Sequence, residues 1–132
     1  EIQSLALNAI GYLITRDVDN ARELMKVGGI PPLIAFLDHN SSRIKFFAAA
    51  CSWVLAAYQD EFQGALLDAG AVPKLLALIN CSHEDISWQA AGALRNIVLK
   101  NERVHKAIVD DNGLEKYKVA LCTNSDRSDR VL

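Results

Sequence analysis

Hydrophobic and polar positions along the chain repeat every 42 residues, and the register does not shift. Positions that lie one period apart include Leu24, Leu66 and Ile108; Gly28, Gly70 and Asn112; Leu37, Ile79 and Leu121; and Ile2, Ile44 and Ile86. Self-similarity at this period is typical of stacked supersecondary units, each of which buries its apolar face on the next one. The pattern therefore predicts a solenoid, a class of fold that usually presents a long surface to another macromolecule.

Within each unit the apolar spacing predicts three helices. The first helices are expected at 18–27, 60–69 and 102–111, the second at 30–37, 72–79 and 114–121, and the third and longest at 2–15, 43–57 and 85–99. Each first helix ends at Gly28, Gly70 or Asn112, residue types that tolerate a left-handed cap. Pro31 or Pro73 follows at once and suits the first turn of the second helix.

This spacing divides the chain into one repeat domain with four parts. Residues 1–16 are expected to form the third helix of one repeat, residues 17–58 and 59–100 two full repeats, and residues 101–132 a partial repeat. Because residue 1 is not methionine and residues 2–14 already have the pattern of a packed helix, we expect the chain to be a segment of a longer array.

The turn and helix motifs resemble those of the armadillo repeat family. The family pattern is a Gly-Gly/Ala-hydrophobic-Pro turn, a Leu-rich helix, a polar turn and a third helix that ends in Ala-Leu-x-Asn-hydrophobic; here it corresponds to residues 70–79 and 86–97. The resemblance covers residues 1 to about 122. It implies an all-α, right-handed superhelix whose third helices line a concave groove, and binding of extended peptide segments in that groove.

The importin-alpha branch of that family pairs a Trp with an Asn four residues later on successive third helices, where they hold basic peptides. The corresponding pairs here are Asn8/Tyr12, Ala50/Val54 and Gly92/Asn96. Only Asn96 matches. The resemblance therefore favours a more general binding scaffold over an importin-like transport adaptor, which would require affinity for Lys-rich peptides.

Nine residues on or beside the expected groove are candidates for partner binding, since aromatic side chains offer contact area at a low entropic cost. They are Tyr12, Phe46, Phe47, Trp53, Val54, Trp88, Gln89, Arg95 and Asn96. A matching ligand would place an apolar anchor against Phe47, Trp53 and Val54, and backbone polar groups near Gln89 and Asn96. The alternative is that several of the aromatic residues pack between repeats, and that Asn96 holds a neighbouring helix end.

Composition narrows the classes of partner. Hydrophobic residues make up 51% of the chain and the net charge is −2, so the chain is rich in core residues and lacks the basic excess of most nucleic-acid binders. No apolar run approaches the length of a membrane span. The cysteines number three and are not paired by spacing, which favours reduced thiols in the cytoplasm or nucleus over a disulfide framework.

Chemistry at a catalytic or metal centre is not expected. His39, Cys81, His83 and Cys122 are spread over three repeats and are not expected to form a converging ligand set. No phosphate-binding glycine loop or nucleophile motif is present, because Gly28-Gly29 recurs as a helix cap. We therefore expect no enzyme activity, no metal and no cofactor.

The sequence predicts a non-catalytic protein–protein interaction scaffold that binds extended peptide segments. A structural alternative is a spacer or oligomerisation segment within a larger protein. Helix 2–15 supports that alternative, because it carries Ile2, Leu5, Leu7, Ile10, Leu13 and Ile14 with no earlier repeat in the sequence to cover them. Terminal repeats normally need a polar cap, so self-association or fraying is expected at this end.

Overall fold

The computed structural model describes residues 2–58, 61–110 and 114–115. They form, in chain order, α1 (Ile2–Arg16), α2 (Val18–Lys26), α3 (Ile30–Ala35), the 3-10 turn η1 (Phe36–Asp38), α4 (Ser42–Ala57), α5 (Glu61–Asp68), α6 (Ala71–Ile79), α7 (Glu84–Lys100) and α8 (Glu102–Asp110). The predicted helices are all present in this range, and their ends agree to within a few residues. All but the first two residues of the expected second helix at 114–121, and the cap at Asn112, lie outside the described residues.

Local backbone chemistry sets the helix boundaries. Gly28 and Gly70 have φ of 74° and 78°, in the left-handed region that favours glycine, which confirms the predicted caps after α2 and α5. Pro31 lies in the first turn of α3. At the other kind of boundary, the side chain of Asp17 accepts a hydrogen bond from a backbone N–H at the start of α2, and Ser41 does the same for α4.

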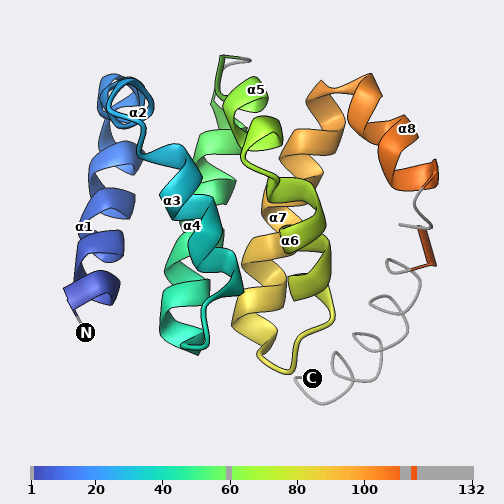
Figure 1. Cartoon of the computed structure of the whole chain (residues 1–132), viewed down its shortest axis with the longest axis horizontal. Helices are drawn as coiled ribbons and strands as arrows, with labels where there is room; N and C mark the ends of the chain where they lie inside the picture. Colours follow the sequence, from blue (N-terminus) through green and yellow to red (C-terminus); the bar gives the residue numbers. More distant parts are fainter. Residues whose placement is uncertain (1, 59–60, 111–113, 116–132) are drawn as a thin grey trace.

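The helices form a solenoid in which the long third helices of successive units, α1, α4 and α7, stand side by side (Figure 1). In the same view α3 lies in front of α4, and α6 lies in front of α7. The short helices α2, α5 and α8 follow one another at the end where the third helices finish. We call the layer formed by α1, α4 and α7 the third-helix layer.

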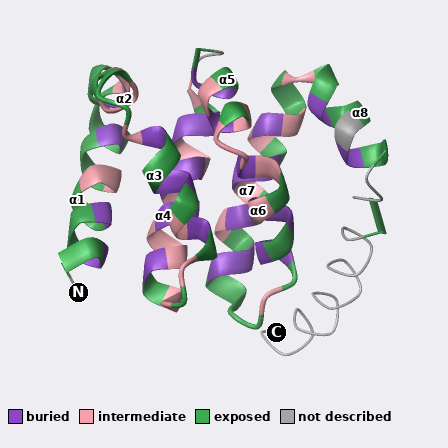
Figure 2. Cartoon of the chain, in the orientation of Figure 1, coloured by how far each residue is buried: buried purple, intermediate pink, exposed green. Residues whose placement is uncertain are grey.

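The core lies between these helices and repeats with the same period (Figure 2). Leu37 and Ile79 are both buried, as are Ile44 and Ile86. Small residues occupy the places where third helices meet. Those that are at most 1% exposed include Ala48, Ala49, Cys51, Ala90 and Ala93. Their size lets the helix backbones approach closely.

The carboxyl ends of α1 and α4 are each capped by a residue of the next unit. The Tyr58 hydroxyl donates to the carbonyl of Ile14 at the end of α1, and the Lys100 ammonium donates to the carbonyls of Ala57 and Tyr58 at the end of α4. Tyr58 and Lys100 are one period apart. Two chemically different donors therefore bond to backbone carbonyls at equivalent helix ends, where carbonyls lack partners within the helix.

A second capping contact comes from the short first helix of each unit and always spans seven residues. Asn20 donates to the carbonyl of Leu13 at 2.9 Å, and Gln63 donates to that of Ala56 at 3.1 Å. His105 Nε2 lies 2.6 Å from the carbonyl oxygen of Val98. These contacts fix the angle between each third helix and the helix that follows it.

Candidate functional site

A hollow of about 290 Å³ lies between α1 and α4 in the third-helix layer. We call it the Gly11 hollow, after the glycine of α1 in its lining; a Cβ added to Gly11 would lie 3.3 Å from Cys51 Sγ. It is lined by Leu7, Asn8, Gly11, Tyr12, Thr15, Phe46, Phe47, Ala50, Cys51 and Val54. Four of the nine predicted site residues, Tyr12, Phe46, Phe47 and Val54, therefore lie around one cavity.

The floor of the Gly11 hollow is apolar and buried. Leu7 and Cys51 are 2% and 1% exposed, and the Cys51 thiol donates a weak hydrogen bond to the carbonyl of Leu7 at 3.7 Å. Burial raises the pKa of Cys51 to about 12, so the thiol stays protonated and neutral at physiological pH. A neutral floor of this kind suits an apolar group and disfavours a charged one.

The walls and rim differ from the floor. Phe46 and Phe47 are half-buried and meet edge to face, with ring centroids 5.5 Å apart. At the rim the Tyr12 ring is 64% exposed, and the guanidinium of Arg16 lies 5.7 Å from its centroid. The lining residues include no acidic side chain, and the nearest charge at the rim is positive.

The next junction, between α4 and α7, is closed by Trp53. Its indole covers Gly92: an added Cβ at Gly92 would lie 2.6 Å from two of the indole ring carbons. Trp53 is one period after Gly11, and Gly92 is one period after Ala50. The two junctions are thus built from equivalent positions. In the junction between α4 and α7 the position carries tryptophan, whereas in the junction between α1 and α4 it carries glycine.

The remaining predicted site residues lie on α7. Trp88 is 69% exposed, Arg95 is exposed, and Gln89 and Asn96 are half-buried. Arg95 Nη1 lies 3.5 Å from Asn96 Oδ1, at the limit of a hydrogen bond. The structure therefore divides the nine candidates into a group around the Gly11 hollow, the packing residue Trp53 and a group on α7. Contact with a partner stays a prediction for all nine.

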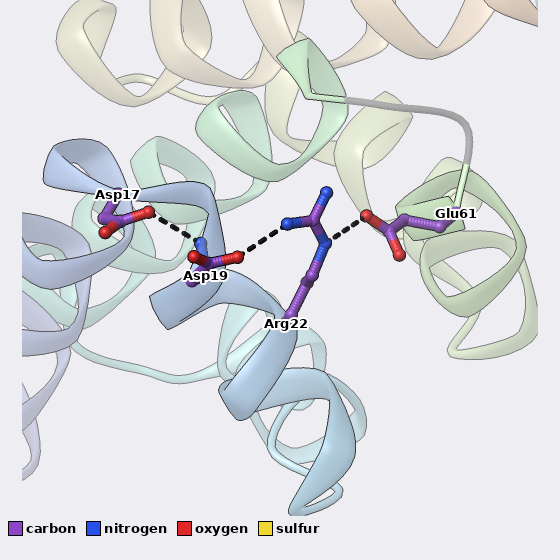
Figure 3. Close-up of polar contacts among 4 residues, drawn as sticks. All are labelled: Asp17, Asp19, Arg22 and Glu61. Atoms are coloured by element: carbon purple, nitrogen blue, oxygen red, sulfur yellow. Dashed lines mark hydrogen bonds and ion pairs between the residues drawn. The ribbon is translucent and has the colours of Figure 1, made fainter.

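A polar network between successive units is a feature that the apolar pattern does not reveal (Figure 3). Arg22 in α2 donates to Glu61 in α5 at 2.8 Å and to Asp19 at 2.6 Å, while Asp17 accepts from the backbone N–H of Asp19. The hydrogen bonds that Arg22 donates to Glu61 and, to a lesser extent, to Asp19 raise the pKa of Arg22 above its ordinary value. The network joins the short first helices of two units and keeps their charges paired.

The structure describes three of the four residues considered for a metal site, His39, Cys81 and His83. Within the ranges that the structure describes, no group of three or more His, Cys, Asp or Glu side chains could hold a metal ion. His83 Nε2 lies 3.1 Å from Ser42 Oγ, and His39 Nδ1 accepts from the backbone N–H of Ser41 at 3.0 Å. Cys122 lies outside the described residues.

No single helix among the described residues is long and apolar enough to cross a membrane. By length and composition alone, the pair α5 and α6, bent by 77°, would together be long and apolar enough.

Comparison with solved structures shows the class of fold. The chain superimposes on an engineered protein with a TM-score of 0.84 at 28% identity, over 91% of this chain and 49% of that one. A computationally designed armadillo repeat protein for modular peptide recognition gives a TM-score of 0.83 at 24% identity, over 89% and 49% of the two chains. A third, the designed armadillo repeat protein YIII(Dq.V1)4CPAF, was solved in complex with the peptide (KR)4; it gives 0.67 at 26% identity, over 71% and 39%. The fold is thus an all-α armadillo solenoid.

The sequence comparisons agree with that class. The model of the armadillo/beta-catenin-like repeat matches residues 59–99. The adenomatous polyposis coli protein of Homo sapiens is 31% identical over 100 residues, which are 76% of this chain and 4% of that protein. The Hsp70 nucleotide exchange factor fes-1 of Neurospora crassa is 28% identical over 118 residues, 88% of this chain and 48% of that protein. The chain belongs to the armadillo repeat family, and it spans less than half of the length of either relative.

Proposed function

We propose that the chain is a non-catalytic protein-interaction scaffold that binds extended peptide segments across the third-helix layer. The observation that carries the proposal is the Gly11 hollow, which gathers Tyr12, Phe47 and Val54 around an open cavity on that layer. Half-buried aromatic side chains beside a cavity are common anchors in protein interfaces. The description of one structural neighbour as a protein for modular peptide recognition supports the same use of the fold.

The polar half of the proposed surface lies on α7. Gln89 and Asn96 are half-buried there, with side-chain amides that suit hydrogen bonds to the backbone of an extended peptide. The spacing of seven residues places them two helical turns apart on one side of α7. A peptide that crosses the layer from α1 to α7 would meet an apolar site first and amide groups next.

The test is a selection of peptides from a random displayed library against the chain, followed by calorimetric titration of the selected peptides. Phe47→Ala and Asn96→Ala should each weaken binding by about tenfold or more, as expected for interface anchors. Glu23→Ala on the exposed side of α2 is the matched control and should bind as the wild type does. Circular dichroism confirms folding. Undiminished affinity in both variants would refute the proposal.

Lys-rich peptides should bind weakly. The Trp–Asn pairs that hold basic peptides in importin-alpha are absent from the third helices, since Gly92 and Ala50 stand at the Trp positions. The lining of the Gly11 hollow also provides no carboxylate to pair with an ammonium group. Titration with the peptide (KR)4 tests this, and submicromolar affinity would restore the transport-adaptor alternative. Location in the cytoplasm or nucleus stays a prediction.

A second candidate is a structural role through self-association of α1. Ile2, Leu5 and Leu13 are 84%, 57% and 52% exposed, which is unusual for large apolar side chains on one helix. Sedimentation velocity over a range of concentrations should show dimers that Leu5→Lys with Leu13→Lys removes. A monomer at all concentrations would exclude this role.

A further inference from the structure

We infer that the Gly11 hollow receives a tryptophan-like aromatic side chain of a bound peptide, inserted between α1 and α4. The inference rests on the proposed function and specifies its anchor. The molecule contains its own point of comparison, because Trp53 fills the equivalent place in the next junction.

The two junctions can be compared residue by residue. Shifting Gly11, Ala50 and Cys51 by one period gives Trp53, Gly92 and Ala93. Between α4 and α7 the Trp53 indole lies directly on Gly92, whose missing Cβ makes room for the ring. Between α1 and α4 no side chain projects from Gly11, and an open space of about 290 Å³ remains. The next junction therefore shows that a tryptophan side chain can stand at this position when it faces glycine; here the facing residue is Ala50, and a Cβ added to Gly11 would lie 3.3 Å from Cys51 Sγ.

Size and polarity agree with an aromatic occupant. A cavity of 290 Å³ is just below the range of about 300–1,000 Å³ that holds whole small-molecule ligands, so it fits one large side chain better than a ligand. The buried floor of Leu7 and Cys51 is apolar, and Phe46 and Phe47 offer ring edges and faces to a flat aromatic group. Asn8 and Thr15 at the exposed edge can bond to the indole N–H or to the peptide backbone.

Charge distinguishes an aromatic anchor from a lysine or arginine. The lining has no carboxylate, and the guanidinium of Arg16 stands over the Tyr12 ring at the rim. A cationic side chain would lose its hydration without gaining a counter-ion. A neutral aromatic side chain loses little and buries apolar area in exchange.

The experiment uses 3-methylindole, the side chain of tryptophan, as the probe in an NMR titration of the whole chain. It should shift the amide signals of Gly11 and Ala50 saturably, whereas n-butylammonium, an analogue of the lysine side chain, should not shift them. The absence of a saturable shift with 3-methylindole, or an equal response to n-butylammonium, would overturn the inference.

A pair of variants checks that the probe occupies the hollow. Gly11→Trp combined with Ala50→Gly copies the Trp53–Gly92 pair, so the new indole fills the hollow from within and should weaken the probe's binding by at least about tenfold. Ala50→Gly alone is the matched control and should keep the site. Unchanged probe affinity in the double variant would place the probe elsewhere and overturn the inference. The double variant should also melt at a higher temperature than Ala50→Gly.

A peptide arm separates this inference from the proposed function. Selected peptides should carry an aromatic residue whose change to alanine weakens binding to the wild type but not to the double variant. Selected peptides could also bind the third-helix layer with an affinity that neither the alanine change in the peptide nor the double variant alters. In that case the anchor inference is wrong and the scaffold proposal stands. If no peptide binds that layer while 3-methylindole still shifts Gly11, the scaffold proposal is wrong and only the cavity's preference for indole survives.

Discussion

Replacement of Gly92 by alanine tests whether Trp53 sets the distance between α4 and α7. A Cβ on residue 92 would lie 2.6 Å from Cδ2 and Cε3 of Trp53 and 2.7 Å from Cε2. Carbon atoms pack best at about 3.5–4.0 Å. The new methyl group would therefore meet three atoms of one rigid ring, and either the indole or the helix must move.

Two opposing effects decide the magnitude. Alanine in place of glycine within a helix normally stabilises by about 1 kcal/mol, because glycine loses more backbone freedom on folding. An inserted methyl group in a packed junction costs about 1–3 kcal/mol. Since the fused ring of Trp53 has no flexible end that can bend away, the upper part of that range applies. We expect Gly92→Ala to lower the free energy of unfolding by about 1–2 kcal/mol.

Urea unfolding followed by circular dichroism provides the assay. Gly64→Ala is the matched control, because Gly64 also lies within a helix and nothing stands within 4 Å of an added Cβ there. It should stabilise by about 0.5–1 kcal/mol. If Gly92→Ala stabilised the protein as much as Gly64→Ala does, Trp53 would not pack on Gly92 as described.

A double-mutant cycle isolates the contact from general effects on the helix. Trp53→Ala should itself cost about 2–3 kcal/mol, less than a fully buried Trp because the ring is half-buried. In that background Gly92→Ala should become stabilising, since the clash is gone and the helix gain remains. The coupling energy should be about 1–3 kcal/mol. A coupling energy near zero would refute the reasoning.

Three further predictions concern a cap and the thiols. Gly70→Val should cost about 1–3 kcal/mol, because φ of 78° is strained for a β-branched residue; an unchanged melting temperature would contradict it. In a Cys122→Ser background, maleimide should label the half-exposed Cys81 much faster than the buried Cys51; equal rates would contradict the burial. The pKa of Cys51 is raised to about 12 from an ordinary 9.0. The unfolded chain therefore loses this proton first as the pH rises, and stability should fall between about pH 9 and 12 by up to about 1.4 kcal/mol per pH unit. Cys51→Ala should remove this contribution, and the same alkaline slope in both proteins would disprove it.

The sequence predicts the fold well because helix caps and apolar spacing are local signals. Gly28 and Gly70 mark the ends of α2 and α5 in the structure as they do in the pattern. The 42-residue period then places equivalent helices next to one another without further information. Small residues are buried on the third helices in successive units, as Ala48 and Ala90 show, and they leave room for the helix backbones to approach.

Capping contacts between units were not predicted, because the residues that make them differ in chemistry. Tyr58 and Lys100 perform the same task one period apart, as a hydroxyl and an ammonium group. A search for apolar residues in phase does not detect such a pair. A search for side-chain hydrogen-bond donors in phase would have found it, because Arg16 stands at the corresponding position before them.

The Gly11 hollow is harder to predict from the sequence. Its two defining residues, Gly11 and Ala50, are both small, whereas the equivalent residues of the next junction are Trp53 and Gly92. Trp53 and Gly92 are 39 residues apart, about one helical turn less than the 42-residue period. Their contact therefore does not show up as a match between equivalent positions. The same position is therefore glycine in α1, tryptophan in α4 and arginine in α7, while the core positions around it remain apolar. One variable position beside an unchanging core can open or close a junction without altering the fold. This separation lets the Trp53 junction pack tightly while the junction between α1 and α4 keeps an open cavity.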